Sequence, residues 1–365
     1  MSEWLIYLDN NATTPILPEV VSAMMEDLDG IPRNPSSVTK WGREGRDKIS
    51  KARRQIASYF GVHPEEVFFT SGGTESNHFL IHSFYSAKPG KIISTEIEHA
   101  SALEAIKFLK AGFYLPIDHF GAPTPSQVAN SLTNNTSSIF LSAVNSETGV
   151  MIDLKEIASI AQKAKIPLLI DGVALLGKGP ISPLPEGIAG ISFSGHKIHG
   201  PKGIGLVIKR KQYKIPPIFR GGHQERDMRA GTENLPGILG LAKAIDLLED
   251  SFFTTIHSTK TLFEEEVKRL IPWIEINGTG PKISNLSNLH FSDHDAELLL
   301  INLEKRGVLC SLGSACSSGT LKASHVLLGM GYPIKRAIGS LRFSFSRLNT
   351  QEEAKKSAQI LSSLV

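Results

Sequence analysis

Ile191-Ser192-Phe193-Ser194-Gly195-His196-Lys197 is central to the predicted fold, and it precedes Ile198-His199-Gly200-Pro201-Lys202-Gly203 and a second apolar run over residues 204–208. Ser-Gly ends the first β-favouring run, and the glycines and proline after Lys197 prevent a long helix. We therefore predict that Lys197 lies on a loop at a strand end. Open α/β sheets bind ligands outside the carboxyl ends of their strands. Lys197 is thus either a residue that reacts with a carbonyl cofactor or, as most lysines are, an exposed surface residue.

The composition is typical of a globular protein large enough for two associated domains, with 365 residues of which 41% are apolar and 7% aromatic. Lys+Arg number 39 and Asp+Glu 36, and this balance argues against nucleic acid or a membrane surface as a partner. Two cysteines, Cys310 and Cys316, are too few for a disulfide framework. Because the sequence also lacks a signal-peptide pattern and a membrane-spanning apolar run, we predict a cytoplasmic protein that acts on small molecules.

Apolar runs alternate with helical segments from Glu66 to Ile208, which predicts an α/β fold. We expect a mostly parallel sheet of about seven strands with helices on both faces, because the strands read as nearly continuous apolar runs. Amphipathic segments over residues 235–250 and 259–270 lead away from this unit. We therefore predict a large domain over residues 13–250 and a smaller α+β domain formed by residues 1–12 and 251–365.

Polar residues follow several predicted strands. Ser71-Gly72-Gly73-Thr74 joins a strand to a helix, and its glycines and the unpaired N–H groups of the helix start suit a phosphate. Asp171 directly follows an apolar strand, where a buried carboxylate needs a partner such as a protonated ring nitrogen. His99 lies near another strand end, where it is either structural or able to stack on a planar cofactor and move protons. We expect these residues, Asn145 and Lys197 to emerge at one edge of the sheet.

Other positions are candidates for substrate or partner contacts. Asn34, held extended by Pro35, is a candidate substrate contact, and Arg342 can bind a carboxylate in a bidentate manner. The Arg- and Gly-rich segment over residues 220–232 faces either solvent or a charged ligand in a neighbouring subunit. Cys316 lies in a loop of small residues, as a nucleophile that must move would, whereas Cys310 has apolar neighbours. We reject a metal site at residues 292–295, because the start of a helix accounts for their acids and histidines.

An ordered set of motifs spans nearly the whole chain. The motifs are Tyr7-Leu8-Asp9-Asn10-Asn11-Ala12-Thr13-Thr14, Thr70-Ser71-Gly72-Gly73-Thr74-Glu75-Ser76-Asn77, Glu98-His99, Ser194-Gly195-His196-Lys197 with Gly200-Pro201-Lys202-Gly203, Arg229-Ala230-Gly231-Thr232, Gly313-Ser314-Ala315-Cys316 and Leu341-Arg342-Phe343-Ser344. Together they resemble the NifS/IscS-like cysteine desulfurases. This group is a branch of the class V aminotransferase family, whose members have fold type I domains that bind pyridoxal 5'-phosphate (PLP).

The resemblance implies a role for each matching residue. Lys197 would bind PLP covalently, with Asp171 on the pyridine nitrogen, His99 stacked on the ring and Asn145 near the phenolic oxygen. The phosphate would be held by Gly73, Thr74, Ser194, Gly195 and His196, and by Thr232 of the partner subunit. Asn34 and Arg342 would bind the substrate carboxylate, and His99, Lys197 and Cys316 would carry the chemistry.

The implied function is that of a homodimeric cysteine desulfurase, which converts L-cysteine to L-alanine and forms a persulfide on Cys316. The sulfur would pass to an acceptor or iron–sulfur scaffold protein, for cluster assembly or thiolation. Two alternatives stay open. The first is another class V PLP enzyme, such as a selenocysteine lyase or an aminotransferase, and Cys316 disfavours it. The second is a catalytically weakened scaffold for sulfur-transfer partners, and the pair Lys197 and Asp171 disfavours it.

One position departs from the family pattern. Ala174 stands where a glutamine usually donates a hydrogen bond to the phenolic oxygen of the cofactor. A hydrogen bond of about 0.5–1.5 kcal/mol is then missing, so we expect the protonation of the bound cofactor to change.

Overall fold

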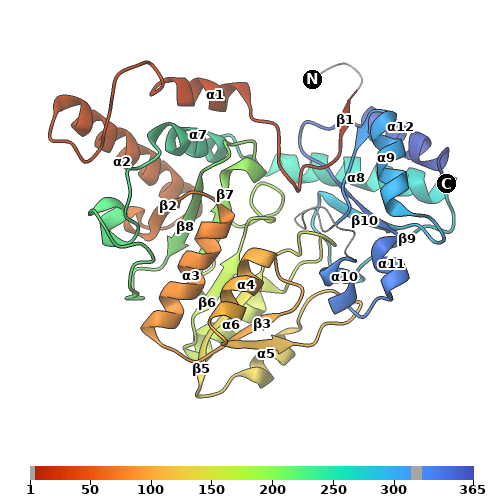
Figure 1. Ribbon diagram of the computed structural model, residues 1–365, viewed down its shortest axis with the longest axis horizontal. Helices are drawn as coiled ribbons and strands as arrows, with labels where there is room; N and C mark the ends of the chain where they lie inside the picture. The colour runs from red at the N-terminus through yellow and green to blue at the C-terminus, as the bar shows by residue number, and fades with distance from the viewer. Residues whose placement is uncertain (1–4, 314–322) are drawn as a thin grey trace.

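A computed structural model describes residues 5–313 and 323–365, so Cys316 lies outside the described residues. The chain forms two parts that lie side by side (Figure 1). The red-to-green part surrounds a large sheet, and the blue part contains smaller sheets together with the red strand β1 (Ile6–Tyr7). No helix among the described residues is long and apolar enough to cross a membrane.

In the described part of the chain the large sheet has seven strands in the order β2-β8-β7-β6-β5-β3-β4. They are β2 (Val67–Thr70), β3 (Lys91–Thr95), β4 (Gly112–Leu115), β5 (Thr136–Ser142), β6 (Leu168–Asp171), β7 (Ile188–Ser194) and β8 (Gly205–Lys209). Neighbouring strands are parallel except β8, which runs antiparallel to β2 and β7. The predicted α/β fold with a mostly parallel sheet is therefore confirmed.

Helices cover both faces of this sheet. The helices α3 (Gly73–Ala87) and α4 (Ala100–Phe108) share one apolar core with it, and α2 (Lys40–Phe60), α6 (Leu154–Ala164) and α7 (Leu235–Asp246) share another. The shorter helices are α1 (Pro18–Met25) and α5 (Pro125–Ser131). Successive side chains of a strand point to opposite faces, so Leu168 and Ile170 of β6 enter the second core and Leu169 enters the first. The strand is apolar throughout because helices cover both of its faces.

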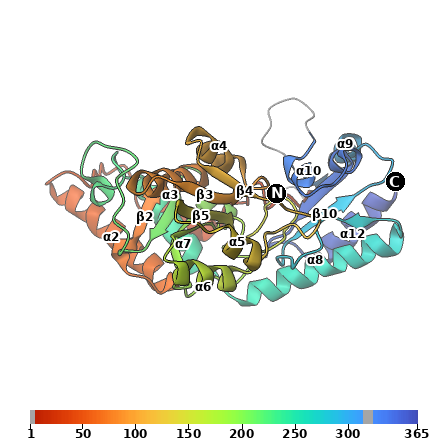
Figure 2. The ribbon, with the colours of Figure 1, turned by 90° about the horizontal axis from the view of Figure 1, so that it is seen from below.

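The blue part contains segments from both ends of the chain. β1 pairs in parallel with β11 (Val308–Leu309), and β9 (Glu275–Ile276), β10 (Leu286–His290) and β12 (Ser340–Ser344) form an antiparallel sheet. Its helices are α8 (Ser251–Leu270), α9 (Ala296–Lys305), α10 (His325–Gly329), α11 (Ile334–Ile338) and α12 (Gln351–Ser362), and Figure 2 shows α8 beside α12. Ile6 and Leu8 share an apolar core with Phe263 and Phe343. The predicted domain boundaries, after residue 12 and after residue 250, stay a prediction.

Candidate active site

A cavity of about 600 Å³ lies where the carboxyl ends of the central strands meet the loop after β1 and strand β12. Of the predicted site residues that the structure describes, eight line it, namely Gly73, Thr74, His99, Asp171, Ser194, His196, Lys197 and Arg342. Asn11 and Ala12 from the N-terminal loop complete the wall near Lys197. This is the edge at which open α/β sheets bind their ligands.

Lys197 ends a short 3₁₀ turn (Gly195–Lys197) that directly follows β7. The turn is tight, because a Cβ atom on Gly195 would lie 2.9 Å from the carbonyl oxygen of Pro201. The Lys197 ammonium donates hydrogen bonds to the carbonyl oxygens of Asn11, at 2.5 Å, and of Ala12, at 2.8 Å. The loop after β1 therefore holds the amine at the cavity wall.

The start of α3 forms a second hollow, of about 430 Å³, beside the main cavity. Gly72, Gly73, Thr74, Ser194 and His196 are among the residues that line it. Ser194 Oγ is buried and has no hydrogen-bond partner among the described residues. A hydroxyl donor, glycines and a helix N-terminus are the groups that bind phosphate, so these residues fit the phosphate of PLP.

His196 is a neutral imidazole in this setting. Burial, followed by the charge of Lys197, lowers the pKa of His196 to about 4. Its Nδ1 lies 3.1 Å from Thr13 Oγ1, which joins the N-terminal loop to the phosphate hollow. The predicted Gly195 does not line either cavity, and it acts through the turn that positions His196 and Lys197.

Asp171 lies at the end of β6 and is 7% exposed. Its Oδ2 accepts a hydrogen bond from Asn77 Nδ2 at 2.7 Å, and its Oδ1 accepts one from the Val173 N–H at 3.0 Å. No ion pair joins it to a cation within the described ranges. A carboxylate in a cavity wall with donors but without a cation fits a protonated ring nitrogen.

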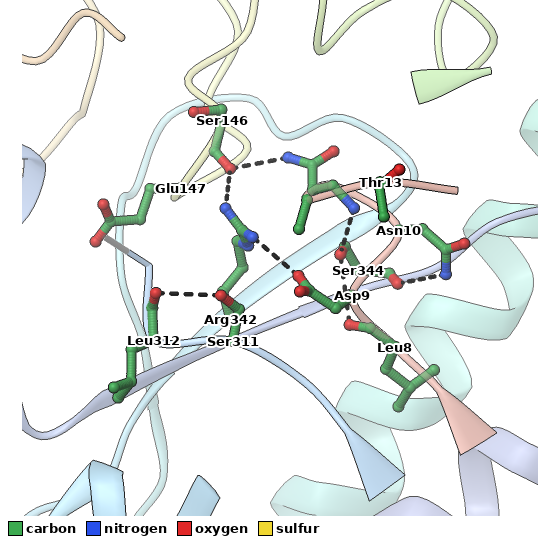
Figure 3. A network of polar contacts seen from close by, with 12 residues as sticks. Leu8, Asp9, Asn10, Thr13, Ser146, Glu147, Ser311, Leu312, Arg342 and Ser344 are labelled. Atoms are coloured by element: carbon green, nitrogen blue, oxygen red, sulfur yellow. Dashed lines mark hydrogen bonds and ion pairs between the residues drawn. The ribbon is translucent and has the colours of Figure 1, made fainter. Parts of the chain in front are cut away.

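Arg342 on β12 is fixed from two sides, as Figure 3 shows. Its Nη2 donates to Asp9 Oδ1 at 2.9 Å and its Nη1 donates to the Ser146 carbonyl oxygen at 3.1 Å. The guanidinium Nε is buried and has no hydrogen-bond partner among the residues described. Arg342 thus retains a buried donor at the cavity wall, which suits a substrate carboxylate.

Glu147 lines the same cavity, and no sequence pattern singled it out. Its side chain is 3% exposed, and its Oε1 is a buried acceptor without a partner in the described part of the chain. Burial raises the pKa of Glu147. A Cβ atom on Gly313 would lie 2.2 Å from the Glu147 carboxyl carbon, so a larger residue there would require the Glu147 side chain to move. Gly313, which lies against Glu147, is three residues before Cys316 in the sequence.

Besides Gly195, the structure places three predicted site residues away from the cavity wall. Asn145 builds the turn after β5, since its Oδ1 accepts from the N–H groups of Glu147 and Thr148 and its Nδ2 donates to the Ile97 carbonyl. Asn34 is exposed, and its Oδ1 accepts from the Ser36 N–H. Thr232 is exposed on the segment that follows η3 (Gln224–Asp227). Their roles toward cofactor and substrate stay predictions.

Sequence reasoning missed Lys178 altogether. Its side chain is buried, and Nζ donates to Asn11 Oδ1 at 3.3 Å. Burial, followed by the charges of Lys197 and Arg342, lowers the pKa of Lys178 to about 7. The only sequence feature that could have indicated a buried lysine is its setting among leucines and glycines, in Leu175-Leu176-Gly177-Lys178-Gly179.

Two further predictions concern metal ions and Cys310. The described residues contain no group of three or more His, Cys, Asp or Glu side chains that could hold a metal ion. At residues 292–295, Asp295 accepts hydrogen bonds from Glu297 and Leu298 as the cap of α9. Cys310 is buried in the core of the blue part, and burial raises the pKa of its thiol. A buried thiol of this kind is a poor nucleophile.

Comparisons with known proteins show the family of this chain. The family model described as aminotransferase class-V matches residues 6–356. The chain is 38% identical to cysteine desulfurase 2 of Trichormus variabilis, over 99% of this chain and 93% of that protein. It is 36% identical to the cysteine desulfurase NifS of Azotobacter vinelandii, over 95% and 89% of the two chains.

Solved structures of similar proteins have the same fold as this chain. A NifS-like protein superposes with a TM-score of 0.90 at 29% identity and covers 99% of both chains. The structure of SspA in complex with cysteine superposes with a TM-score of 0.80 at 28% identity, over 94% of this chain and 99% of that one. The chain therefore belongs to the class-V aminotransferase family and, within it, to the group of the NifS/IscS-like cysteine desulfurases.

Proposed function

We propose that this protein is a PLP-dependent cysteine desulfurase that converts L-cysteine to L-alanine and transfers the sulfur to Cys316. The observation that carries the proposal is one cavity lined by Lys197, Asp171 and Arg342, beside a phosphate-binding helix start. Family membership supports it, and so does the relative whose structure contains cysteine. Since the relatives named above are cysteine desulfurases, a selenocysteine lyase, an aminotransferase or an inactive scaffold is not favoured.

The cofactor would be held at three points by groups that the structure already positions. Lys197 would bind its aldehyde carbon, Asp171 its ring nitrogen, and Thr74 and Ser194 its phosphate, with His99 against the ring. When bound, PLP withdraws electrons from the substrate Cα, which is the chemistry that the group supplies. The protein contributes orientation and charge, and Arg342 Nε would donate to the carboxylate of L-cysteine.

The sulfur step would be carried by Cys316. Its thiolate would attack the substrate sulfur, so that an S–S bond forms while the substrate C–S bond breaks, and the electron pair and a proton stay with alanine. L-cysteine and one protein thiol then give L-alanine and one protein persulfide. Cys310 is unsuited to this step, because burial raises the pKa of its thiol and so disfavours the thiolate.

We extend the proposal to a cytoplasmic homodimer that delivers sulfur to an acceptor or iron–sulfur scaffold protein. Thr232 is exposed, three residues after Arg229, whose ion pair with Glu75 at 2.8 Å anchors this segment beside the phosphate hollow. The family resemblance implies that the exposed Thr232 of each subunit contacts the phosphate in the partner's site. Light scattering tests the dimer. Mixing inactive Lys197→Ala and Thr232→Ala subunits tests the shared site, because mixed dimers should regain activity, and no gain over either parent would contradict sharing.

The deciding experiment is incubation of the purified yellow protein with L-cysteine. We expect alanine and, with a thiol reductant, sulfide in equal amounts. Lys197→Ala is the control without covalent cofactor, and borohydride reduction followed by peptide mapping should place the pyridoxyl group on Lys197. Label on Lys202, or release of pyruvate in place of alanine, would contradict the proposal.

A further inference from the structure

A buried chain of hydrogen bonds connects Asp171 to His99. Asn77 on α3 donates from Nδ2 to Asp171 Oδ2 at 2.7 Å and to Ser101 Oγ at 3.0 Å. Ser101 Oγ in turn lies 2.8 Å from His99 Nδ1. Asn77, Ser101 and Asp171 are 1%, 8% and 7% exposed, so these bonds are largely buried in the wall of the cavity. The chain therefore joins the two residues predicted to contact the cofactor ring.

The direction of each hydrogen follows from the chemistry of the groups. An ionised carboxylate only accepts hydrogen bonds, so the Asn77 amide must turn its NH₂ toward Asp171. Ser192 Oγ fixes the same orientation from the other side, because it donates to Asn77 Oδ1 at 2.5 Å. The two hydrogens of the Asn77 NH₂ are then used by Asp171 and Ser101.

Ser101 accepts the hydrogen from Asn77, so its own hydroxyl hydrogen is available for His99 Nδ1. The backbone N–H of Ser101 also donates to His99 Nδ1, at 3.1 Å. Nδ1 thus faces two donors and serves as an acceptor. In a neutral imidazole the hydrogen then belongs on Nε2.

We propose that Asn77 and Ser101 are positioning residues that hold His99 as the neutral imidazole with its hydrogen on Nε2. A ring in this form can donate a hydrogen bond from Nε2, but that nitrogen cannot accept a proton. His99 is then a donor to cofactor or substrate and not a base, and this catalytic part rests on the proposed desulfurase function. Capping of α4 accounts for the Ser101 N–H contact, but not for the buried link through Asn77 to Asp171.

Nitrogen NMR of histidine-labelled protein tests the tautomer without any activity. The full chain without cofactor is compared with Ser101→Ala and Ser101→Thr, and His99→Gln identifies the signals. We expect a protonated Nε2 and an unprotonated Nδ1 in the wild type. Loss of the hydroxyl in Ser101→Ala should shift the tautomer ratio about 2- to 13-fold toward Nδ1–H, which corresponds to a hydrogen bond of roughly 0.5–1.5 kcal/mol. Ser101→Thr keeps a hydroxyl and should retain the wild-type ratio.

A wild-type signal with the hydrogen on Nδ1, or an unchanged ratio in Ser101→Ala, would overturn the tautomer assignment. The catalytic part is tested with holoenzyme and L-cysteine. His99→Gln keeps an N–H donor and should stay within about 10-fold of the wild type, whereas loss of an acid–base group typically costs about 10²–10⁴-fold. Equal losses in His99→Gln and His99→Ala would overturn the donor role. Failure of the wild type to release alanine would instead contradict the proposed function and leave the NMR result standing.

Discussion

Lys178 allows a quantitative test of how the burial of a charged side chain affects the stability of the protein. Lys178 is 4% exposed, and its Nζ donates a hydrogen bond to Asn11 Oδ1 at 3.3 Å. Burial, then the charges of Lys197 and Arg342, lowers its pKa from 10.5 to about 7. No carboxylate forms an ion pair with it within residues 5–313 and 323–365. We predict that Lys178→Met increases the stability of the protein.

The size of the effect follows from the two pKa values of Lys178. Between pH 7 and 10.5 the unfolded chain binds a proton on Lys178 that the folded chain lacks, so wild-type stability rises with pH in this window. At about 1.4 kcal/mol per unit of pKa, the shift sets an upper limit of about 5 kcal/mol below pH 7. Replacing buried charged groups by apolar residues is often stabilising by about 1–4 kcal/mol. We therefore expect Lys178→Met to gain about 2–4 kcal/mol at pH 7 and nothing near pH 10.5.

Urea unfolding of the cofactor-free protein across this pH range measures the free energy of unfolding of both proteins. Lys155→Met is a matched control, because Lys155 is exposed on α6. The control should change neither the stability nor its pH dependence. A Lys178→Met protein that is less stable than the wild type at pH 7, or that keeps the wild-type slope, would refute the reasoning.

Three other predictions have defined outcomes. Burial raises the pKa of Glu98 to about 7, so the folded chain keeps a proton that the unfolded chain releases, and wild-type stability should fall as pH rises from 4.5 to about 7. Glu98→Gln should remove this fall in urea unfolding, and an unchanged slope would argue against it. Cys316→Ser should bind PLP but release no sulfide from L-cysteine, whereas Cys310→Ser should still release it; a persulfide in the Cys316→Ser protein would reject the role of Cys316. Ala174→Gln should supply the missing donor, worth about 0.5–1.5 kcal/mol, and so shift the pH titration of the visible absorption of bound PLP and raise alanine production. If neither changes, Ala174 is neutral.

The fold and the position of the site at the carboxyl ends of the strands were predictable, because one rule links both to the sequence. Leu168-Leu169-Ile170 is apolar at each position, which requires a strand covered on both faces. The polar residue that follows such a strand emerges at its carboxyl end, where ligands bind. Asp171 after β6 and Lys197 after β7 both obey this rule, and both line the cavity.

Side-chain direction and distant partners were not predictable in this way. Asn145 also follows a strand, but its Oδ1 accepts hydrogen bonds from two N–H groups of the next turn, and the sequence pattern does not specify this side-chain direction. Arg342 is fixed by Asp9, which lies 333 positions away in the sequence. Asn77 stands inside a recognised motif, yet its bond to Asp171 depends on how α3 packs on the sheet.

The polar atoms that line the cavity explain why ligands should stabilise this protein. Ser194 Oγ and Arg342 Nε are buried donors without a partner among the described residues, and such groups cost free energy in a folded chain. Proteins tolerate such costs chiefly at functional sites. A phosphate would accept from Ser194 and a carboxylate from Arg342, so the groups that weaken the ligand-free protein are those that the proposed cofactor and substrate satisfy. Binding at 100 times the dissociation constant adds about 2.7 kcal/mol to the free energy of unfolding. PLP and L-cysteine should therefore each raise the stability of the chain through a different buried donor.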